Sequence, residues 1–194
     1  MREECGDAIG EQGRSDLGRV RAAAQRMGDL IDALLSLTNV TRLSVENEET
    51  DLSAIAAGIA ASLEETDPGR DVELSIREGI VTFTDPRLAA VVLENLLANA
   101  WKFTAKASPA RISFDETERD GRRVYFVRDN GVGFDAAYSR QLFRPFQRLH
   151  TEAEFAGTGI GLATVGRVLD RLGGECWADA SEGAGATFSF TLGP

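Results

Sequence analysis

Apolar residues recur at three- and four-residue intervals from Ser15 to about Val45, the spacing that places them on one face of an α-helix. This stripe consists of Leu17, Val20, Ala24, Met27, Ile31, Leu34, Leu35 and Leu37. A helix of this length with a one-sided apolar stripe needs a partner surface. It either folds back on its own chain or pairs with another chain. We favour pairing in a helical bundle, which predicts a homodimer through residues 15–45.

A polar stretch, Asn47–Asp51, marks the boundary to a second unit. We therefore expect two domains, a partial helical unit over residues 1–46 and a globular unit over residues 47–194. Residues 1–13 are interrupted by glycines and are expected to form the end of a helix and a turn.

The globular unit alternates between the helical and the strand period. Helices are predicted over Leu52–Glu65, Pro86–Thr104, part of Asp135–Gln147 and Thr158–Leu172, and strands over Val72–Ile76, Ile80–Thr84, Ala110–Glu118, Arg122–Asp129, Glu175–Ala180 and Ala186–Leu192. Glu78-Gly79 joins the first two strands, and Asp120-Gly121 turns a hairpin between the next two. Strand pairs separated by helices indicate an α+β fold, a two-layer sandwich of a mixed sheet with helices on one face.

The central helix, which Asp85 can cap and Pro86 can open, carries an unusual polar stripe. Asn95, Asn99 and Lys102 lie at i, i+4 and i+7. Both asparagines lie among leucine and alanine, where an unpaired amide is costly. Two amides and an ammonium in line can hold a hydrated divalent cation and a polyphosphate. Alternatively, the amides bond neighbouring backbone and the ammonium is solvated; the helix alone leaves both open.

Three glycine clusters follow this helix: Asp129–Phe134 (DNGVGF), Gly157–Ala163 (GTGIGLA) and Gly183–Thr187 (GAGAT). Glycine lets the backbone approach a ligand closely, and Asp129 can accept a hydrogen bond from an exocyclic amine such as that of adenine. The second cluster opens a helix, whose N–H groups and positive end suit phosphate. In the third cluster, Thr187 offers a hydroxyl close to where a base would lie.

Each glycine cluster alone is a weak signal. The second is not a dinucleotide-binding fingerprint, because it follows a charged loop and not a strand. It is not a Walker loop either, because no Gly-Lys-Ser/Thr follows its glycines. The information lies in the order of the motifs along the chain.

Composition narrows the function classes. The chain is 43% hydrophobic and 27% charged, which is ordinary for a globular protein, and its net charge of −10 argues against a nucleic-acid partner. No apolar run approaches the roughly 20 residues of a membrane span. Residues 1–10 lack the apolar core of a signal peptide, which predicts a cytoplasmic protein. Cys5 and Cys176 match no metal-binding spacing and are expected to be free thiols.

The ordered motifs resemble the ATP-binding catalytic domain of sensor histidine kinases, within the wider superfamily of gyrase, heat-shock chaperones, histidine kinases and MutL. The resemblance covers about residues 47–192. Upstream, Arg21–Leu37 resembles the second helix of the dimerisation and histidine-phosphotransfer domain. Phe146–His150 (FQRLH) and the short lid Thr151–Ala156 are similar to phytochrome-type and related PAS-linked kinases. The resemblance implies a Bergerat-type ATP-binding fold, ATP as substrate, Mg²⁺ as cofactor and a response regulator as protein partner.

The resemblance also implies roles for the polar residues. Asn99 would ligate Mg²⁺, with Asn95 as a second ligand or support. Lys102 would neutralise phosphate charge, and Arg148, just before the lid, could reach the γ-phosphate. Phosphoryl transfer depends on positioning and charge neutralisation, for which these groups are adequate.

The glycine clusters correspond to the family's nucleotide-binding boxes. Asp129 would bind the adenine amine, while Gly131 and Gly133 would shape the pocket. The other residues that the resemblance implies for the ATP site are Phe143, Gly157, Thr158, Gly159, Ile160, Gly161, Leu162 and Thr187.

One position separates a kinase from a hydrolase. Hydrolytic members of the superfamily carry a glutamate four residues before the metal-binding asparagine, where it activates water. Here that position is Asn95, and an amide cannot act as a general base. Glu94 lies about 100° away around the helix. This favours transfer to a protein acceptor over hydrolysis.

The phosphoacceptor is the main departure from the family pattern. His150 is the only histidine, but it lies at the edge of the lid, whereas the family places its acceptor on the first helix of the bundle. We expect that helix to be mostly missing, so that the chain binds ATP and Mg²⁺ and phosphorylates a histidine of another chain or of a missing segment. The alternatives are a non-catalytic module that pairs with a kinase bundle and sequesters it, and an ATPase or serine-kinase relative.

Overall fold

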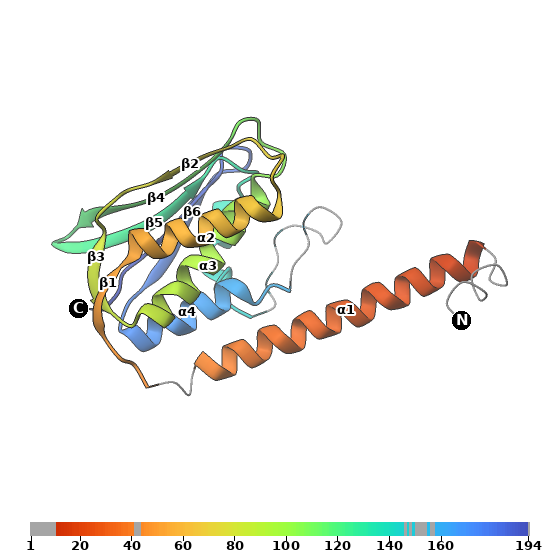
Figure 1. The fold of residues 1–194 in the computed structure, drawn as a ribbon, viewed down its shortest axis with the longest axis horizontal. Coiled ribbons are helices and arrows are strands. Elements are labelled where there is room, and N and C mark those ends of the chain that lie inside the picture. Colours follow the sequence, from red (N-terminus) through yellow and green to blue (C-terminus); the bar gives the residue numbers. More distant parts are fainter. Residues whose placement is uncertain are drawn as a thin grey trace.

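The computed structural model describes residues 11–40, 44–145, 147, 149, 155 and 158–193. Its globular part is a two-layer sandwich in which helices cover one face of a five-stranded sheet (Figure 1). The strands lie in the order β2 (Val72–Ile76), β4 (Ala110–Arg119), β5 (Arg122–Asp129), β7 (Ala186–Phe190) and β6 (Cys176–Ala180). β2 runs parallel to β4 and the other neighbours are antiparallel, so the sheet is mixed. The predicted α+β fold class is confirmed.

The layer of helices packs its apolar stripes against alternate side chains of the sheet. It consists of α2 (Leu52–Thr66), α3 (Pro86–Phe103) and α4 (Gly161–Leu172). α3 is central, and its Leu88, Val92 and Leu96 are buried. They share the core with Phe114 of β4 and Tyr125 of β5, as the helical and strand periods require. α3 begins at the predicted residue, Pro86. The Asp85 side chain caps it by accepting hydrogen bonds from the amides of Arg87 and Leu88.

The strands β1 (Glu48–Asp51) and β3 (Val81–Thr84) form a separate antiparallel ribbon. Residues 48–51, within the polar stretch at which the sequence places the start of the second unit, form a strand, and β3 pairs with β1 and not with its sequence neighbour β2. β1 has no apolar alternation, because of its four residues only Thr50 is buried. Its strand conformation follows from pairing with β3 and not from its own sequence.

The N-terminal helix α1 spans Glu11–Val40 and extends away from the sandwich, with its C-terminal part beside α4 (Figure 1). The predicted bounds, 15–45, are therefore wrong at both ends. The stripe residues Leu17, Val20, Met27 and Ile31 are 55–65% exposed. Within the described ranges, no part of the chain buries the stripe at these four positions, so there the helix does not fold back on the described part of its own domain.

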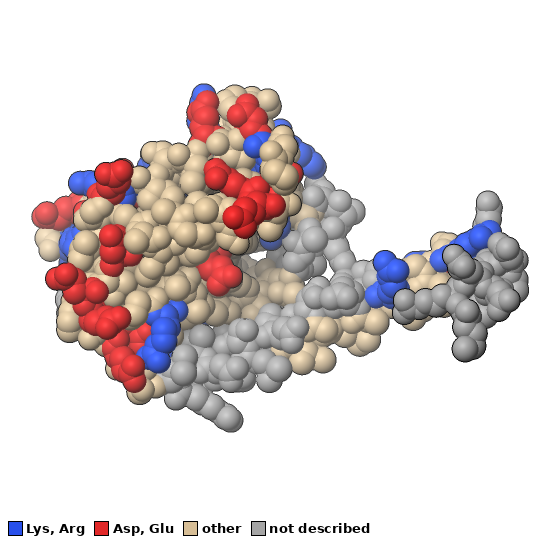
Figure 2. Space-filling model, in the orientation of Figure 1, with Lys and Arg blue, Asp and Glu red and all other residues tan. Residues whose placement is uncertain are grey.

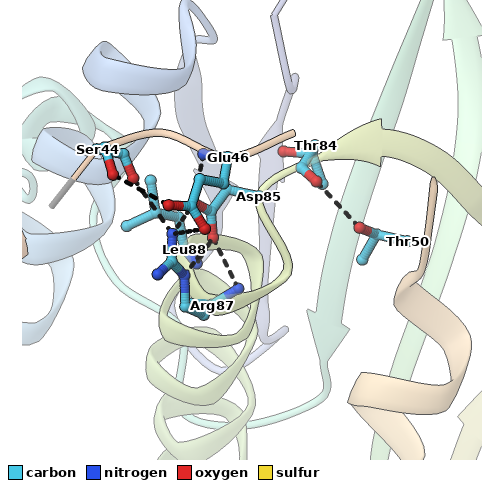
Figure 3. A network of polar contacts seen from close by, with 7 residues as sticks. All are labelled: Ser44, Glu46, Thr50, Thr84, Asp85, Arg87 and Leu88. Carbon is cyan, nitrogen blue, oxygen red and sulfur yellow. Dashed lines mark hydrogen bonds and ion pairs between the residues drawn. The ribbon is translucent and has the colours of Figure 1, made fainter. Parts of the chain in front are cut away.

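Residues 44–46, which precede β1, are held through the buried carboxylate of Asp85 (Figure 3). This carboxylate accepts hydrogen bonds from the Glu46 amide at 2.9 Å and from the Arg87 side chain at 2.8 and 3.2 Å. Arg87 in turn donates to the Ser44 carbonyl and forms an ion pair with Glu46. These contacts hold residues 44–46 in a non-helical conformation, which explains why α1 does not continue to Val45.

The surface matches the acidic composition. In the view of Figure 2, acidic side chains gather along the edge of the sandwich that carries β1, whose sequence is EETD. Among the helices of the described residues, none combines the length and apolar composition that crossing a membrane requires.

Candidate functional site

A pocket bordered by predicted site residues lies between α3, the start of α4 and the loop after β5. Its volume is about 230 Å³. It is lined by Asn99, Lys102, Phe103, Asp129, Gly133, Phe134, Leu142, Gln147, Leu149, Phe155, Thr158, Gly159, Gly161, Leu162, Ala186 and Phe188. Segments far apart in the sequence therefore meet at one cavity, whose lining combines polar with aromatic and aliphatic side chains.

Asn99 and Lys102 of α3 both border this pocket, as predicted from their one-sided spacing. The Lys102 ammonium lies 4.3 Å from the centroid of the Phe103 ring, a cation–π contact that keeps it beside the cavity. The structure thus places an amide oxygen and a positive charge on the same wall.

Asn95, the third residue of the stripe, does not line the pocket. Its Nδ2 donates to the Val91 carbonyl at 2.7 Å, one turn earlier in the helix. Its Oδ1 lies against Gly161, where a Cβ atom would be 2.6 Å away. The interpretation in which an amide bonds neighbouring backbone is confirmed for Asn95, whereas Asn99 lines the cavity.

Asp129 ends β5 and lies at the inner wall of the pocket, with 5% of its surface exposed. Burial raises the pKa of Asp129 to about 6, although hydrogen bonds from the Gly131 and Ala186 amides oppose the shift. In the folded state the Asp129 carboxyl therefore holds its proton more tightly than an exposed aspartate does. The group is suited to a polar ligand that donates a hydrogen bond to it.

The loop after Asp129 is held by close backbone packing. A Cβ atom on Gly131 would lie 2.5 Å from the Phe103 carbonyl, and one on Gly133, whose φ is +61°, would collide with the Ser181 carbonyl. The Gly183 amide donates to the Val132 carbonyl at 2.7 Å. These two glycines serve chain packing around the pocket, since larger residues would push the loop off α3 and the 181–185 turn.

The N-terminus of α4 opens toward the cavity. Thr158, Gly159, Gly161 and Leu162 line it, and the residue at the N-cap position, Ile160, makes no side-chain capping bond. Ile160 has no side-chain acceptor with which to cap the first N–H groups of the helix, and with the positive end of the helix these groups suit an anionic ligand. Ile160 itself is 2% exposed and packs into the interior.

Two predicted residues lie away from the pocket, and two more lie outside the described residues. Thr187 of β7 does not line the pocket: its hydroxyl accepts from Arg128 at 3.2 Å on the opposite face of the sheet, while its neighbour Ala186 lies at the cavity. A shift of one residue along a strand reverses the face. Phe143 is half-buried beside Gly166 of α4 and does not border the cavity. Arg148 and Gly157, like His150, lie outside the described residues.

A sequence model of the family "Histidine kinase-, DNA gyrase B-, and HSP90-like ATPase" matches residues 84–194. The chain belongs to this family. It is 32% identical over 195 residues to cyanobacterial phytochrome B of Nostoc sp., an alignment that covers 99% of this chain and 26% of that protein. It is 30% identical over 193 residues to the methanogenesis regulatory histidine kinase FilI of Methanothrix harundinacea, with 99% and 22% covered. The chain thus spans about a quarter of the length of these relatives.

Solved structures agree on the fold of this ATPase-like domain. Full-length ShkA in complex with AMPPNP superposes with a TM-score of 0.70 at 21% identity, covering 95% of this chain and 39% of that one. A catalytic domain of the histidine kinase ThkA gives a TM-score of 0.62 at 22% identity, covering 76% and 95%. The resemblance to sensor histidine kinases expected from the sequence is confirmed.

Within this family domain, sequence reasoning missed much of the apolar wall. Phe134, Leu142 and Phe155 line the cavity, and the Phe155 ring contacts the Phe103 ring edge to face at 5.0 Å between centroids. Phe134 is the last residue of the DNGVGF motif, and the motif assigned no role to its ring. Phe155 lies in the charged lid segment, where the only available signal was a single large apolar residue in polar surroundings.

Proposed function

We propose that residues 47–194 bind ATP with Mg²⁺ and transfer the γ-phosphate to a histidine on another chain or on a segment outside this one. The observation that carries the proposal is the meeting of Asn99, Lys102, the buried Asp129 and the uncapped start of α4 at a single pocket. Asp129 would accept from the adenine amine, Phe134 and Leu142 would contact the base, and the amides of 158–162 and Lys102 would hold the phosphates.

The donor groups fit a magnesium ion that is held together with a nucleotide. Among the described residues, no three carboxylate, histidine or cysteine side chains gather as a metal cage. Mg²⁺ binds through one or two protein oxygens, waters and substrate phosphates, so the Asn99 amide oxygen at the pocket is a suitable ligand. When bound, the ion would neutralise charge on the transferring phosphate. Asn95 packs against Gly161 of α4 outside the pocket lining and is not proposed as a ligand of the magnesium ion.

Transfer is favoured over hydrolysis by the residue at position 95. Its amide cannot take a proton from water, and its nitrogen is already engaged with Val91. Glu94, one residue away, is exposed and does not border the cavity.

The partners follow from the same proposal. The exposed stripe of α1 would pair two copies of the chain in a helical bundle, with residues 1–46 as a partial dimerisation and phosphotransfer unit and 47–194 as the catalytic domain. The phosphoacceptor histidine would come from such a bundle, which makes the complete kinase a phosphoprotein, and a response regulator would receive the phosphate. Arg148 and Gly157 keep their proposed roles at the γ-phosphate, and the cytoplasmic location stays a prediction.

A transfer assay tests the proposal. The chain is incubated with γ-labelled ATP, Mg²⁺ and a separate acceptor-bearing bundle, and acid-labile label should appear on the acceptor histidine. Asn99→Asp should abolish the transfer, whereas Asn47→Asp, at an exposed site remote from the pocket, should not. Nucleotide binding without any label would favour the non-catalytic module, and free phosphate or acid-stable label would favour the ATPase or serine-kinase relative.

A further inference from the structure

Arg70 links the turn after α2 to the C-terminal end of α3. Its Nη1 donates to the Trp101 carbonyl at 2.6 Å and its Nη2 donates to the Thr104 hydroxyl at 2.7 Å. The guanidinium also lies 4.8 Å from the centroid of the Trp101 ring. A planar fork with two donors and a stacking face is specific to arginine, since a lysine ammonium has neither.

The last turn of a helix has carbonyl groups without intrahelical partners, and here each of them is bonded. The Ala100 and Lys102 carbonyls accept from the segment just after the helix, including the Thr104 amide and hydroxyl. The Trp101 carbonyl accepts from Arg70 at 2.6 Å and also from the Thr104 hydroxyl at 3.1 Å, and the Phe103 carbonyl accepts from the Val132 amide at 3.3 Å. Arg70 and Val132 therefore provide the hydrogen bonds that reach this turn from distant segments.

This turn presents the ligand-facing side of α3. Lys102 and Phe103 belong to it, and both line the pocket. Through the Phe103 carbonyl, the same turn carries the DNGVG loop, where Gly131 packs without room for a Cβ atom. Arg70 itself does not line the pocket. It therefore bears on the cavity only through the position of this turn.

We infer that Arg70 is a positioning residue for the nucleotide pocket, holding the last turn of α3 so that Lys102 and the DNGVG loop are set for the ligand. This inference rests on the proposed nucleotide site. Burial lowers the pKa of Arg70, opposed by Asp67, and the guanidinium remains charged and able to donate through the physiological range.

Three variants of the full chain test the inference. Arg70→Met keeps an apolar stem but removes both hydrogen bonds, and Arg70→Lys restores a charge without the fork. Arg77→Met is the matched control, because Arg77 is a half-exposed arginine that bonds Asp115 and the Glu116 carbonyl away from the pocket. The dissociation constant for Mg-ATP is measured by calorimetry at a temperature where every variant is folded. Hydrogen exchange of the Val132 amide is measured without nucleotide.

Arg70→Met should raise the Mg-ATP dissociation constant about tenfold, the scale of a lost hydrogen bond to a charged group. Arg70→Lys should lie between it and the wild type, and Arg77→Met should remain within about twofold of the wild type. Exchange at Val132 should be faster in Arg70→Met only. A lower melting temperature with an unchanged dissociation constant would overturn the inference. If even the wild type bound no nucleotide, the proposed function would fail, and unchanged Val132 exchange in Arg70→Met would then overturn this inference separately.

Discussion

The Oδ1 atom of Asn95 on α3 lies 2.6 Å from the point that a Cβ atom of Gly161, the first residue of α4, would occupy. Asparagine and glycine thus fit each other where α3 meets the start of α4. A side chain at position 161 would force the Asn95 side chain to shift, against its hydrogen bond to the Val91 carbonyl. The position of the α4 N-terminus at the pocket therefore depends on a residue that does not face the pocket.

Gly161→Ala should weaken both folding and nucleotide binding. The added methyl group collides with Asn95, and overpacking of this kind costs about 1–3 kcal/mol of unfolding free energy. Urea unfolding and calorimetric titration with Mg-ATP measure the two effects. The double variant Gly161→Ala/Asn95→Ala should recover most of the stability, because it removes the collision.

The matched control for this substitution is Gly58→Ala, in the middle of α2. A Cβ atom there would meet nothing within 4 Å, so this variant should be stabilised by about 0.5–1 kcal/mol through helix propensity. If Gly161→Ala stabilised the protein to the same extent, the contact with Asn95 would not constrain α4.

Asp129→Asn should be more stable than the wild type at neutral pH but bind nucleotide less well. Burial raises the pKa of Asp129 to about 6 in the folded state, from an ordinary value of 3.8. The folded state therefore holds the proton more tightly, and the stability linked to it is present below about pH 4 and is lost as the pH rises through 6. Above that pH the isosteric amide should gain about 3 kcal/mol over the wild type.

Denaturant unfolding of both proteins at pH 4 and pH 7.5, with Mg-ATP titration at pH 7.5, checks this prediction. Asp135→Asn removes an exposed carboxyl that only caps a short 3-10 helix, η1 (Ala136–Gln141), and should show no such gain at neutral pH. Equal stability of Asp129→Asn and the wild type at both pH values would mean that the buried carboxyl carries no cost in the folded state.

The start of the central helix could be predicted to the residue, and its end to within one residue, because its signals are local. Asp85 and Pro86 fix its start, and the helical period of Leu88, Val92 and Leu96 fixes its buried face. The pairing of strands is not local. β1 has a sequence that predicts a polar connection, and it is extended because it hydrogen-bonds to β3.

The site shows the same division. The order of the motifs predicted one shared ligand site for Asn99, Lys102 and Asp129. The structure brings these three residues to one cavity. Thr187 could not be separated from Ala186, because a strand register one residue different points the opposite side chain inward. Asn95 bonds the Val91 carbonyl and packs against Gly161 of α4. Periodicity along a single helix cannot predict this, because it carries no information on which helix packs alongside.

Asp85→Ala should destabilise the protein far more than removal of an ordinary N-cap. The Arg87 side chain, together with the amides of Glu46, Leu88 and Arg87, holds the pKa of Asp85 well below its usual range, so its contribution is present above about pH 4 and is lost as the pH falls below that. The loss at pH 7 should be about 2–4 kcal/mol, from a cap and several buried hydrogen bonds. Asp51→Ala is the control, because Asp51 is an exposed N-cap that bonds only the Ala54 amide, and should cost about 1 kcal/mol.

Urea unfolding at pH 7 and pH 3 measures this pair of variants. The difference between Asp85→Ala and the wild type should narrow at pH 3 but not vanish, because the folded-state pKa of Asp85 lies well below that pH. The variant should also free residues 44–46 from α3, since Glu46 loses its acceptor. Amide exchange at Glu46 reports this directly. Retained protection at Glu46 would show that the segment after α1 is held by contacts other than Asp85.

Lysine on the exposed stripe of α1 should disrupt pairing of the chain without affecting the catalytic domain. Val20 and Met27 are 65% and 60% exposed, and burying such side chains in a bundle stabilises it by roughly 1.5–3 kcal/mol each. Val20→Lys/Met27→Lys should therefore raise the dimer dissociation constant at least about a hundredfold in sedimentation equilibrium, while the Mg-ATP dissociation constant stays the same. Gln12→Lys/Ser15→Lys adds the same charge at exposed positions off the stripe and should leave the dimer intact. A self-association equally strong in both double variants would place the dimer contact somewhere other than this stripe.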